Sequence, residues 1–289
     1  MKKIIYFLIL ILNINCTSLD ELTLTSPEEE IITIDSLKIL VIGNSFSEDA
    51  VEKYLHPIAN SANKKIYIGN LYIPAGSLEN HWNNMSNGKA IYRYFTWDFE
   101  GNKKVITNYN LNNALLEQDW DYISLQQVSQ NSGKQASFDP YINFLIEDIK
   151  LKTKPNQKFI LHQTWAYAQN STHSGFRSYN NNQVLMYNSI VNTYNYWLNQ
   201  NENISFVIPA GTAIQNARNT SIGDNLTRDG YHLNNKGKLL AAYTWFEKLY
   251  QIPATDNKFV TEDVSETENI VIKKCAHASV LNPDTITLF

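Results

Sequence analysis

Residues 40–50 read LVIGNSFSEDA, a passage from apolar to polar side chains. The run Ile39–Ile42 is wholly apolar and rich in β-branched residues, which predicts a buried strand of a parallel sheet. The pair Gly43-Asn44 ends this run, because glycine adopts positive φ freely and asparagine does so more easily than most residues. Ser47–Asp49 then supply capping groups, which predict a helix beginning near Ala50. The stretch therefore indicates a strand, a sharp turn and a helix, the unit of an α/β fold.

Ser45 is expected on that turn, at the carboxyl end of a strand. Open α/β sheets bind their ligands at this edge, and the amino terminus of a helix favours developing negative charge. These are the requirements of a nucleophilic serine. Strand–turn–helix junctions are also common in α/β folds that lack such a serine, so a plain turn residue or helix cap fits Ser45 as well.

The sequence that decides between these interpretations lies near the other end, where residues 228–233 read RDGYHL. A serine hydroxyl is a weak nucleophile at neutral pH and needs a base, and a histidine oriented by a carboxylate is the usual solution. Asp229 and His232 are three residues apart on one loop, so they can bond locally while His232 reaches Ser45. Taken alone, a capping aspartate beside a surface histidine explains the same spacing.

Together the two motifs resemble blocks I and V of the SGNH (GDSL-type) hydrolases. Block I is usually Gly-Asp-Ser, and this chain has Gly43-Asn44-Ser45, which is similar to a branch whose first block begins Gly-Asn-Ser-Phe-Ser. Block V, Asp-x-x-His, is matched by Asp229 and His232. Over residues 37–253 the resemblance implies a hydrolase domain in which Ser45 is the nucleophile, His232 the base and Asp229 the residue that orients the imidazole. It implies no metal and no cofactor.

The resemblance also implies an oxyanion hole. Block II of the family is a glycine after the second strand, and Gly76 occupies that place, although a turn glycine would look the same. Block III, Gly-x-Asn-Asp, is absent from this chain. The chemistry still needs an amide donor, and the end of the third strand offers four side chains, those of Gln126, Gln127, Gln130 and Asn131. We expect Gln127, nearest to the strand end, to act with the N–H groups of Ser45 and Gly76.

Residues 1–16 have the layout of a signal peptide. Two lysines precede an almost unbroken apolar run, Ile4–Leu12, that is too short to span a bilayer. Cys16 follows where it resembles the cysteine of a bacterial lipobox, which carries lipid, although Asn15 departs from the small residue usual before it. We expect an exported protein, lipid-anchored through Cys16 in the outer membrane of a Gram-negative bacterium. A periplasmic or secreted protein is the alternative.

The rest of the chain divides into a tether, one domain and an extension. Residues 17–36 are polar and acidic and predict a flexible tether. Residues 37–253 alternate between strand and helix patterns, which predicts a three-layer α/β/α sandwich with a doubly wound, SGNH/flavodoxin-like parallel sheet of about five strands. Residues 254–289 remain as a C-terminal extension with one predicted helix, Glu266–Leu281.

Aromatic side chains are candidates for substrate contact. Trp165 follows the fourth strand and Tyr231 precedes His232, so we expect both rings to face the substrate, with Asn44 beside them. A β-hairpin is predicted over residues 91–98 and 103–108. Its rings either wall a sugar site or simply pack the hairpin onto the body of the domain.

The composition argues against several other classes of protein. The net charge is −4 without a basic stripe, which argues against a nucleic-acid partner. The six histidines lack zinc-like spacing, and no motif indicates a glycosidase with paired carboxylates. His162 also lies at a strand end, but no aspartate precedes it by three residues, so a core histidine is the preferred interpretation. Cys16 and Cys275 are the only cysteines, so the fold must rest on its hydrophobic core.

Two classes of function remain. The first is a serine esterase that removes acyl groups, above all acetyl groups, from a glycan outside the cytoplasm. The second is a non-catalytic glycan-binding lipoprotein that retains the fold with a degenerate site, an interpretation that the altered blocks I and III keep open. Turnover of an acetate ester distinguishes the two.

Overall fold

The structure is a computed structural model and describes residues 35–289. The predicted signal peptide, the predicted lipidation site Cys16 and almost all of the predicted tether lie outside the described residues. Within residues 35–289, no helix combines the length and the apolar character needed to cross a membrane.

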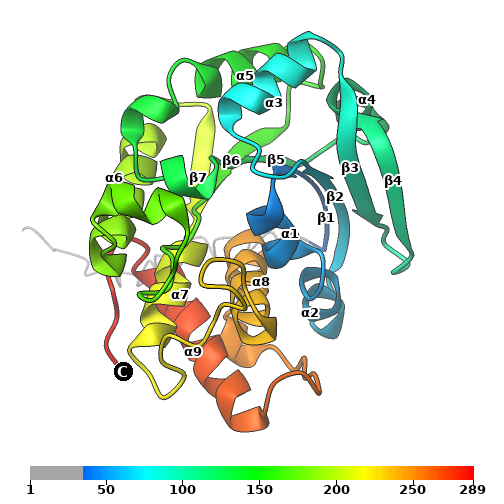
Figure 1. Ribbon diagram of the computed structural model, residues 1–289. Coiled ribbons are helices and arrows are strands. Elements are labelled where there is room, and N and C mark those ends of the chain that lie inside the picture. Colours follow the sequence, from blue (N-terminus) through cyan, green and yellow to red (C-terminus); the bar gives the residue numbers. More distant parts are fainter. Residues whose placement is uncertain (1–34) are drawn as a thin grey trace, which may run out of the picture. The chain divides into compact units, whose positions relative to one another are not determined.

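One seven-stranded sheet forms the centre of the domain, in the order β4-β3-β2-β1-β5-β6-β7 (Figure 1). Strands β2, β1, β5, β6 and β7 pair in parallel, which confirms the predicted doubly wound parallel sheet. The predicted hairpin is strands β3 and β4, which extend the sheet at one edge as antiparallel strands. The strand bounds are β1 Ser36–Gly43, β2 Lys65–Tyr72, β3 Ala90–Trp97, β4 Lys103–Asn110, β5 Tyr122–Leu125, β6 Lys158–His162 and β7 Ile204–Ile208.

Helices cover both faces of the sheet and make the three layers. Helices α1, α2 and α8 pack against one another on one face, and α3 and α5 pack together on the other (Figure 1). Residues 39–42 of β1 are fully buried, because a central parallel strand has helices above and below it. The helix bounds are α1 Ser45–Val51, α2 Leu55–Ser61, α3 Leu78–Ser86, α4 Leu111–Glu117, α5 Tyr141–Lys150, α6 Gln183–Gln200, α7 Ala210–Arg218, α8 Asn235–Tyr250 and α9 Glu266–Leu281.

The strand order places a ligand-binding crevice at the end of β1. The chain leaves β1 for β2 on one side and later returns to pair β5 on the other side of β1. In open α/β sheets such a reversal opens a crevice at the carboxyl ends of the strands. Ser45 follows β1 directly and therefore lies at this point.

The C-terminal residues belong to the same compact unit as the sheet. The predicted helix Glu266–Leu281 is α9, and it packs against α7 and α8. Its residues Ile272, Cys275 and Ala276 join the hydrophobic core. Burial raises the pKa of the Cys275 thiol to about 12. Residues 254–289 therefore belong to the same compact unit as residues 37–253.

Candidate active site

Ser45 is the first residue of α1. Asn44 caps the helix, and its Oδ1 accepts the N–H of Phe46 at 3.0 Å. The prediction of a helix start near Ala50 is therefore wrong. The residues expected to cap it are bonded elsewhere, since the Ser47 hydroxyl donates to the carbonyl oxygen of Asn44 at 2.8 Å.

Position 43 requires glycine because a side chain would not fit there, and not because the backbone is left-handed. Gly43 is not among the glycines with positive φ, and Asn44 has a φ of −139°, so the predicted positive φ at this turn is also wrong. A Cβ on Gly43 would lie 2.6 Å from the Ser47 Oγ, inside the first turn of α1. A larger residue would therefore push α1 away from β1 and displace Ser45 with it.

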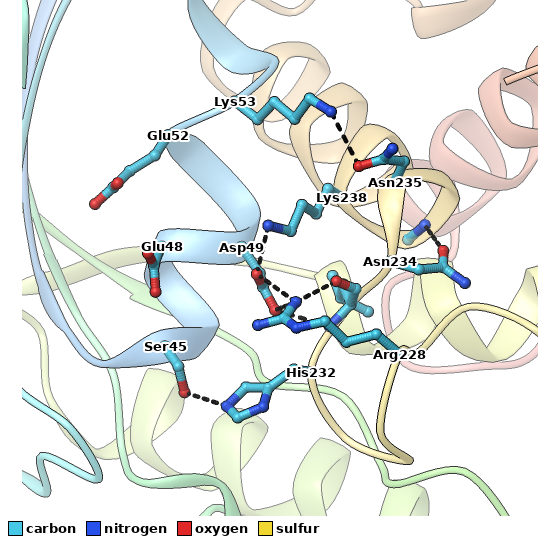
Figure 2. Close-up of polar contacts among 12 residues, drawn as sticks. Ser45, Glu48, Asp49, Glu52, Lys53, Arg228, His232, Asn234, Asn235 and Lys238 are labelled. Atoms are coloured by element: carbon cyan, nitrogen blue, oxygen red, sulfur yellow. Dashed lines mark hydrogen bonds and ion pairs between the residues drawn. The ribbon is translucent and has the colours of Figure 1, made fainter. Parts of the chain in front are cut away.

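The structure brings together the three residues of the predicted triad. Nε2 of His232 lies 2.8 Å from the Ser45 Oγ (Figure 2), and Nδ1 of His232 lies 2.6 Å from Oδ2 of Asp229. The loop that carries Asp229 and His232 closes on itself, because Thr227 pairs with Leu233 as an antiparallel bridge. The two ring nitrogens of His232 thus face a carboxylate on one side and a hydroxyl on the other.

Asp229 is held as a carboxylate by the residues that follow it. Its Oδ1 accepts the backbone N–H of His232 at 2.8 Å and that of Tyr231 at 3.2 Å. Partial burial opposes ionisation, but hydrogen bonds from the His232 ring and from these two N–H groups hold the pKa of Asp229 below its ordinary value. An ionised Asp229 fixes the proton of a neutral His232 on Nδ1 and leaves Nε2 free to accept the proton of Ser45.

Asp49, one helical turn beyond Ser45, anchors this loop to α1 (Figure 2). Its carboxylate is fully buried and lies 3.0 Å from the Arg228 Nη1 and 2.9 Å from the Lys238 Nζ. It also accepts the backbone N–H of Leu233 at 2.7 Å. Arg228 and Leu233 flank the segment that carries Asp229 and His232, so one buried carboxylate links the helix of Ser45 to the loop of His232.

A cavity of about 210 Å³ lies beside Ser45 and His232. Its wall is partly apolar and partly polar, and the polar groups lie on four separate segments of the chain. The apolar lining consists of Phe46, Tyr72, Pro74, Ala75, Val128 and Tyr231, and the polar lining consists of Asn44, Ser45, Ser129, Gln130, His173 and His232.

The two predicted partners of Ser45 in the oxyanion hole do not line this cavity. The N–H of Gly76 donates to the carbonyl oxygen of Ile73 at 3.2 Å, within a turn. The amide of Gln127 is buried and donates to the carbonyl oxygen of Ser137 at 2.7 Å. The neighbouring Ala75 and the more distant Gln130 line the cavity instead.

The residues predicted to contact substrate separate into lining and supporting residues. Tyr231 and Asn44 line the cavity, but the Asn44 side chain is also bonded within the protein, to the carbonyl oxygen of Gly76 at 2.9 Å. Trp165 is fully buried and stacks on Phe46 with ring centroids 4.2 Å apart. Its role is therefore to support the wall from behind, since a buried ring cannot face a substrate.

The histidine at the end of β6 is a core residue, as the sequence indicates. His162 Nδ1 lies 2.9 Å from the Gln126 Oε1, and the Gln126 amide donates to the Asn44 Oδ1 at 2.6 Å. Burial lowers the pKa of His162 to about 3. His162 does not line the cavity, and its contacts fix the position of Asn44 at the helix cap.

The hairpin rings pack onto the domain. Tyr92, Tyr94, Phe95 and Trp97 are all buried, which favours the packing interpretation over a sugar wall. The hairpin affects the site through Arg93, which lies 4.9 Å from the centre of the Tyr72 ring and 3.0 Å from both Glu48 and Glu52. These contacts hold Tyr72 in the cavity wall.

Sequence reasoning missed three residues of the site. Asp49 looks like a helix cap, and its partners are far away in sequence, so no local pattern could reveal its role. Gln130 is one of the four candidate amides, but its greater distance from the strand end ranks it below Gln127. His173 stands alone in a polar loop without a motif, and no sequence signal marks it.

For metals, the side chains of residues 35–289 offer no group of three or more His, Cys, Asp or Glu arranged to hold an ion.

Comparison with known proteins shows the family and the fold of the chain. Residues 38–279 match the family DUF4886, described as a domain of unknown function. The crystal structure of a DUF4886 family protein from Bacteroides uniformis has a TM-score of 0.85 and 40% sequence identity, over 88% of this chain and 98% of that chain. No curated protein matches the chain.

A second similar structure is that of a protein from Slackia heliotrinireducens that is assigned to the SGNH hydrolases. It has a TM-score of 0.50 and 16% sequence identity, over 74% of this chain and 99% of that chain. This likeness concerns the fold alone. With the family match covering most of the described residues, the chain belongs to the DUF4886 family.

Proposed function

We propose that this protein is a serine esterase that removes acyl groups, above all acetyl groups, from a glycan outside the cytoplasm. The observation that carries the proposal is the hydrogen-bonded series Ser45–His232–Asp229, with distances of 2.8 Å and 2.6 Å, at the mouth of a cavity. This geometry matches the requirements of an activated serine nucleophile.

The reaction proceeds in two halves. The Ser45 Oγ attacks the ester carbonyl while His232 Nε2 takes the hydroxyl proton, and His232 then gives that proton to the leaving alcohol. The acyl group remains on Ser45 until water, activated by His232, releases it as the carboxylic acid. Asp229 keeps the imidazole in one tautomer and stabilises its charged form through both steps.

The oxyanion is held by donors that line the cavity. The N–H of Ser45 and the N–H of Ala75 have no acceptor among the described residues, and both residues line the cavity. The side-chain N–H groups of Gln130 are likewise without an acceptor in this part of the chain. We therefore assign the hole to Ser45, Ala75 and Gln130 in place of Gly76 and Gln127. Each donor is expected to contribute about 10² to 10³ in rate.

The size of the cavity favours a short acyl group. Sites for drug-sized ligands span about 300 to 1,000 Å³, and this cavity, at about 210 Å³, is smaller. Acetyl is among the smallest acyl groups, and Phe46 and Val128 supply apolar lining beside Ser45.

We further propose that the chain is exported and anchored by lipid on Cys16. The apolar run before Cys16 supports this proposal, and a glycan substrate outside the cytoplasm is consistent with it. Cys16→Ala should release the protein from the membrane fraction, because stable anchoring depends on the acyl chains. Equal release of wild type and variant would refute lipidation.

The activity is tested with Ser45→Ala, 4-nitrophenyl acetate and acetylated xylan. The wild type should release acetate, and Ser45→Ala should retain less than about a hundredth of the rate, because losing a nucleophile usually costs many orders of magnitude. A fluorophosphonate should label the wild type and leave Ser45→Ala unlabelled. Ser86→Ala, which changes an exposed serine at the end of α3, is the matched control.

An inert wild-type protein that still binds the glycan would instead support a non-catalytic glycan-binding role.

A further inference from the structure

His173 is a second histidine in the cavity, and the triad does not use it. It lies just before a short 3₁₀ helix, Ser174–Tyr179, in the connection between β6 and α6. Its side chain is half-buried in a row of rings, with its ring centroid 4.7 Å from that of Tyr231 and 4.7 Å from that of Tyr167. Tyr231 in turn lies 4.2 Å from the His232 ring. His173, Tyr231 and His232 thus form one continuous wall of the cavity.

The hydrogen bonds of His173 fix which nitrogen carries its proton. Nδ1 accepts the backbone N–H of Gly175 at 3.0 Å, so the neutral ring is protonated at Nε2. Partial burial and the nearby His232 lower the pKa of His173, which keeps the ring neutral at physiological pH. Within residues 35–289 no group accepts the Nε2–H. The free polar atom of His173, a residue that lines the cavity, is therefore a hydrogen-bond donor.

The His173 donor lies on the side of the cavity where the leaving alcohol is expected. In the proposed reaction His232 Nε2 returns its proton to the leaving oxygen, so that oxygen must lie beside His232. The rest of the alcohol then extends along the wall past Tyr231, with its ring and hydroxyl, toward His173. A flat ring followed by an N–H donor suits a sugar, which presents both a C–H face and hydroxyl oxygens.

We propose that His173 determines specificity for the alcohol part of the ester, by donating its Nε2–H to a hydroxyl or ring oxygen of a sugar next to the scissile bond. The proposal rests on the esterase activity proposed above. It assigns the substrate class as sugar esters and distinguishes them from esters of simple alcohols, which offer His173 nothing to bind.

The test compares two esters across His173 variants. The probes are methyl 2-O-acetyl-β-D-xylopyranoside, which keeps free hydroxyls next to the scissile bond, and 4-nitrophenyl acetate. His173→Phe keeps a ring but removes the donor, and should lower the ratio of kcat/KM for the sugar ester to that for the aryl ester about three- to ten-fold, the usual effect of one neutral hydrogen bond. His173→Gln, which retains an N–H donor, should recover most of the ratio.

His56→Phe is the control, because it changes another histidine that stacks on a ring, Trp97, away from the cavity. It should leave the ratio unchanged. An equal loss with both esters in His173→Phe would show that the residue only supports the wall. No loss with either ester would also overturn the proposal.

A binding measurement separates this proposal from the proposed reaction. Calorimetry with the acetylated xyloside on Ser45→Ala and on Ser45→Ala with His173→Phe needs no turnover. Weaker binding in the double variant supports the role of His173 even if the wild type hydrolyses neither ester. Equal binding in the two variants refutes it.

Discussion

At the scale of single residues, the candidate site depends on the orientation of one imidazole. Asp229 contacts Nδ1 of His232, and the Tyr231 ring packs against the His232 ring. The Asp229 side chain is 38% exposed, so water screens its charge. Asp229 therefore contributes to the reaction by fixing the tautomer and the orientation of the His232 ring, more than through the energy of a buried ion pair. A residue acting in this way matters only while its partner histidine is present.

This dependence predicts strongly non-additive kinetics. Asp229→Asn should lower kcat by up to about 10⁴, because the ring can adopt the wrong tautomer, as in serine proteases. His232→Ala should be at least as damaging, and the double variant should be little worse than His232→Ala alone, because the two residues act as a unit. Single-turnover rates with 4-nitrophenyl acetate check this. Full activity in His232→Ala would show that another residue is the base.

Two buried histidines predict that acid destabilises the folded protein. Burial lowers the pKa of His81 and that of His162 to about 3, whereas an unfolded chain binds these protons near pH 6.5. Between these values the unfolded state holds more protons, so the free energy of unfolding decreases as pH falls from about 6.5 toward 3. Each histidine should contribute a loss of about 2 kcal/mol between pH 7 and pH 5.

Urea unfolding of wild type and His162→Gln at pH 7, 6 and 5 measures this contribution. The variant should be less sensitive to pH by about 2 kcal/mol over the range, whatever its stability at pH 7. Parallel pH profiles in the two proteins would mean that His162 is not a source of the acid sensitivity.

At the scale of elements, helix α1 carries both the nucleophile and the anchor of the base. Ser45 begins the helix and Asp49 lies one turn later (Figure 2). The two residues face the same loop, at His232 and at its flanking residues Arg228 and Leu233. A shift of α1 along its axis therefore moves Ser45 and the loop together, which preserves the distance on which the proposed chemistry depends.

The shared anchor makes Asp49→Asn a test of positioning. The variant leaves Arg228 and Lys238 without their carboxylate, and it should lose about 2 to 4 kcal/mol of stability, since both cations are partly exposed and can rehydrate. kcat should fall at least about ten-fold with KM little changed, because a small displacement of a catalytic group is costly. Thermal unfolding and steady-state kinetics provide the two readouts.

Asp49→Glu, which keeps the charge, should recover part of kcat. Lys53→Met is the control, because Lys53 contacts Asp263 and Asn235 and does not touch the loop. A folded Asp49→Asn protein with wild-type kcat would reduce Asp49 to a purely structural residue.

The same elements show what the sequence could and could not predict. The alternation of apolar runs predicts the strands, and the local spacing of Asp229 and His232 predicts their contact, because both depend on neighbours in the chain. The prediction for the start of α1 is wrong because Asn44, Ser47 and Asp49 are all good caps, and only their tertiary partners decide between them. Asp49 and Arg228 are 179 positions apart, and such a pair leaves no trace in a single sequence.

Gln127 lies away from the cavity for a geometric reason. β5 ends at Leu125, and the next two side chains, Gln126 and Gln127, turn into the core. The chain reaches the cavity only at Val128 to Gln130. The distance of a residue from a strand end is therefore a poor guide to whether its side chain reaches the cavity when the residues after the strand are buried. For the same reason, Trp165 does not face the cavity as predicted.

At the scale of the whole molecule, the last helix closes the layer that supports α1. α9 packs on α7 and α8, and α8 packs on α1. His277 on α9 lies 2.6 Å from the buried Glu247 on α8, and Lys236 at the start of α8 pairs with Glu268 on α9. The position of Ser45 thus depends on residues near the C-terminus through two successive helix contacts.

If α9 is part of the cooperative unit, removing its buried apolar groups must destabilise the whole domain. Ile272 is fully buried, while Ile270 on the same helix is 50% exposed. Ile272→Ala should lower the free energy of unfolding by about 2 to 5 kcal/mol, through lost burial and the cavity left behind. Ile270→Ala should change it by less than about 0.5 kcal/mol. Urea unfolding followed by tryptophan fluorescence reports on the sheet side of the domain, because Trp97 on β3 and Trp120 just before β5 lie in the core. A single transition shifted by Ile272→Ala is expected. An unshifted transition would mean that α9 can detach while the sheet stays folded, and then α8 alone would have to hold α1 in place.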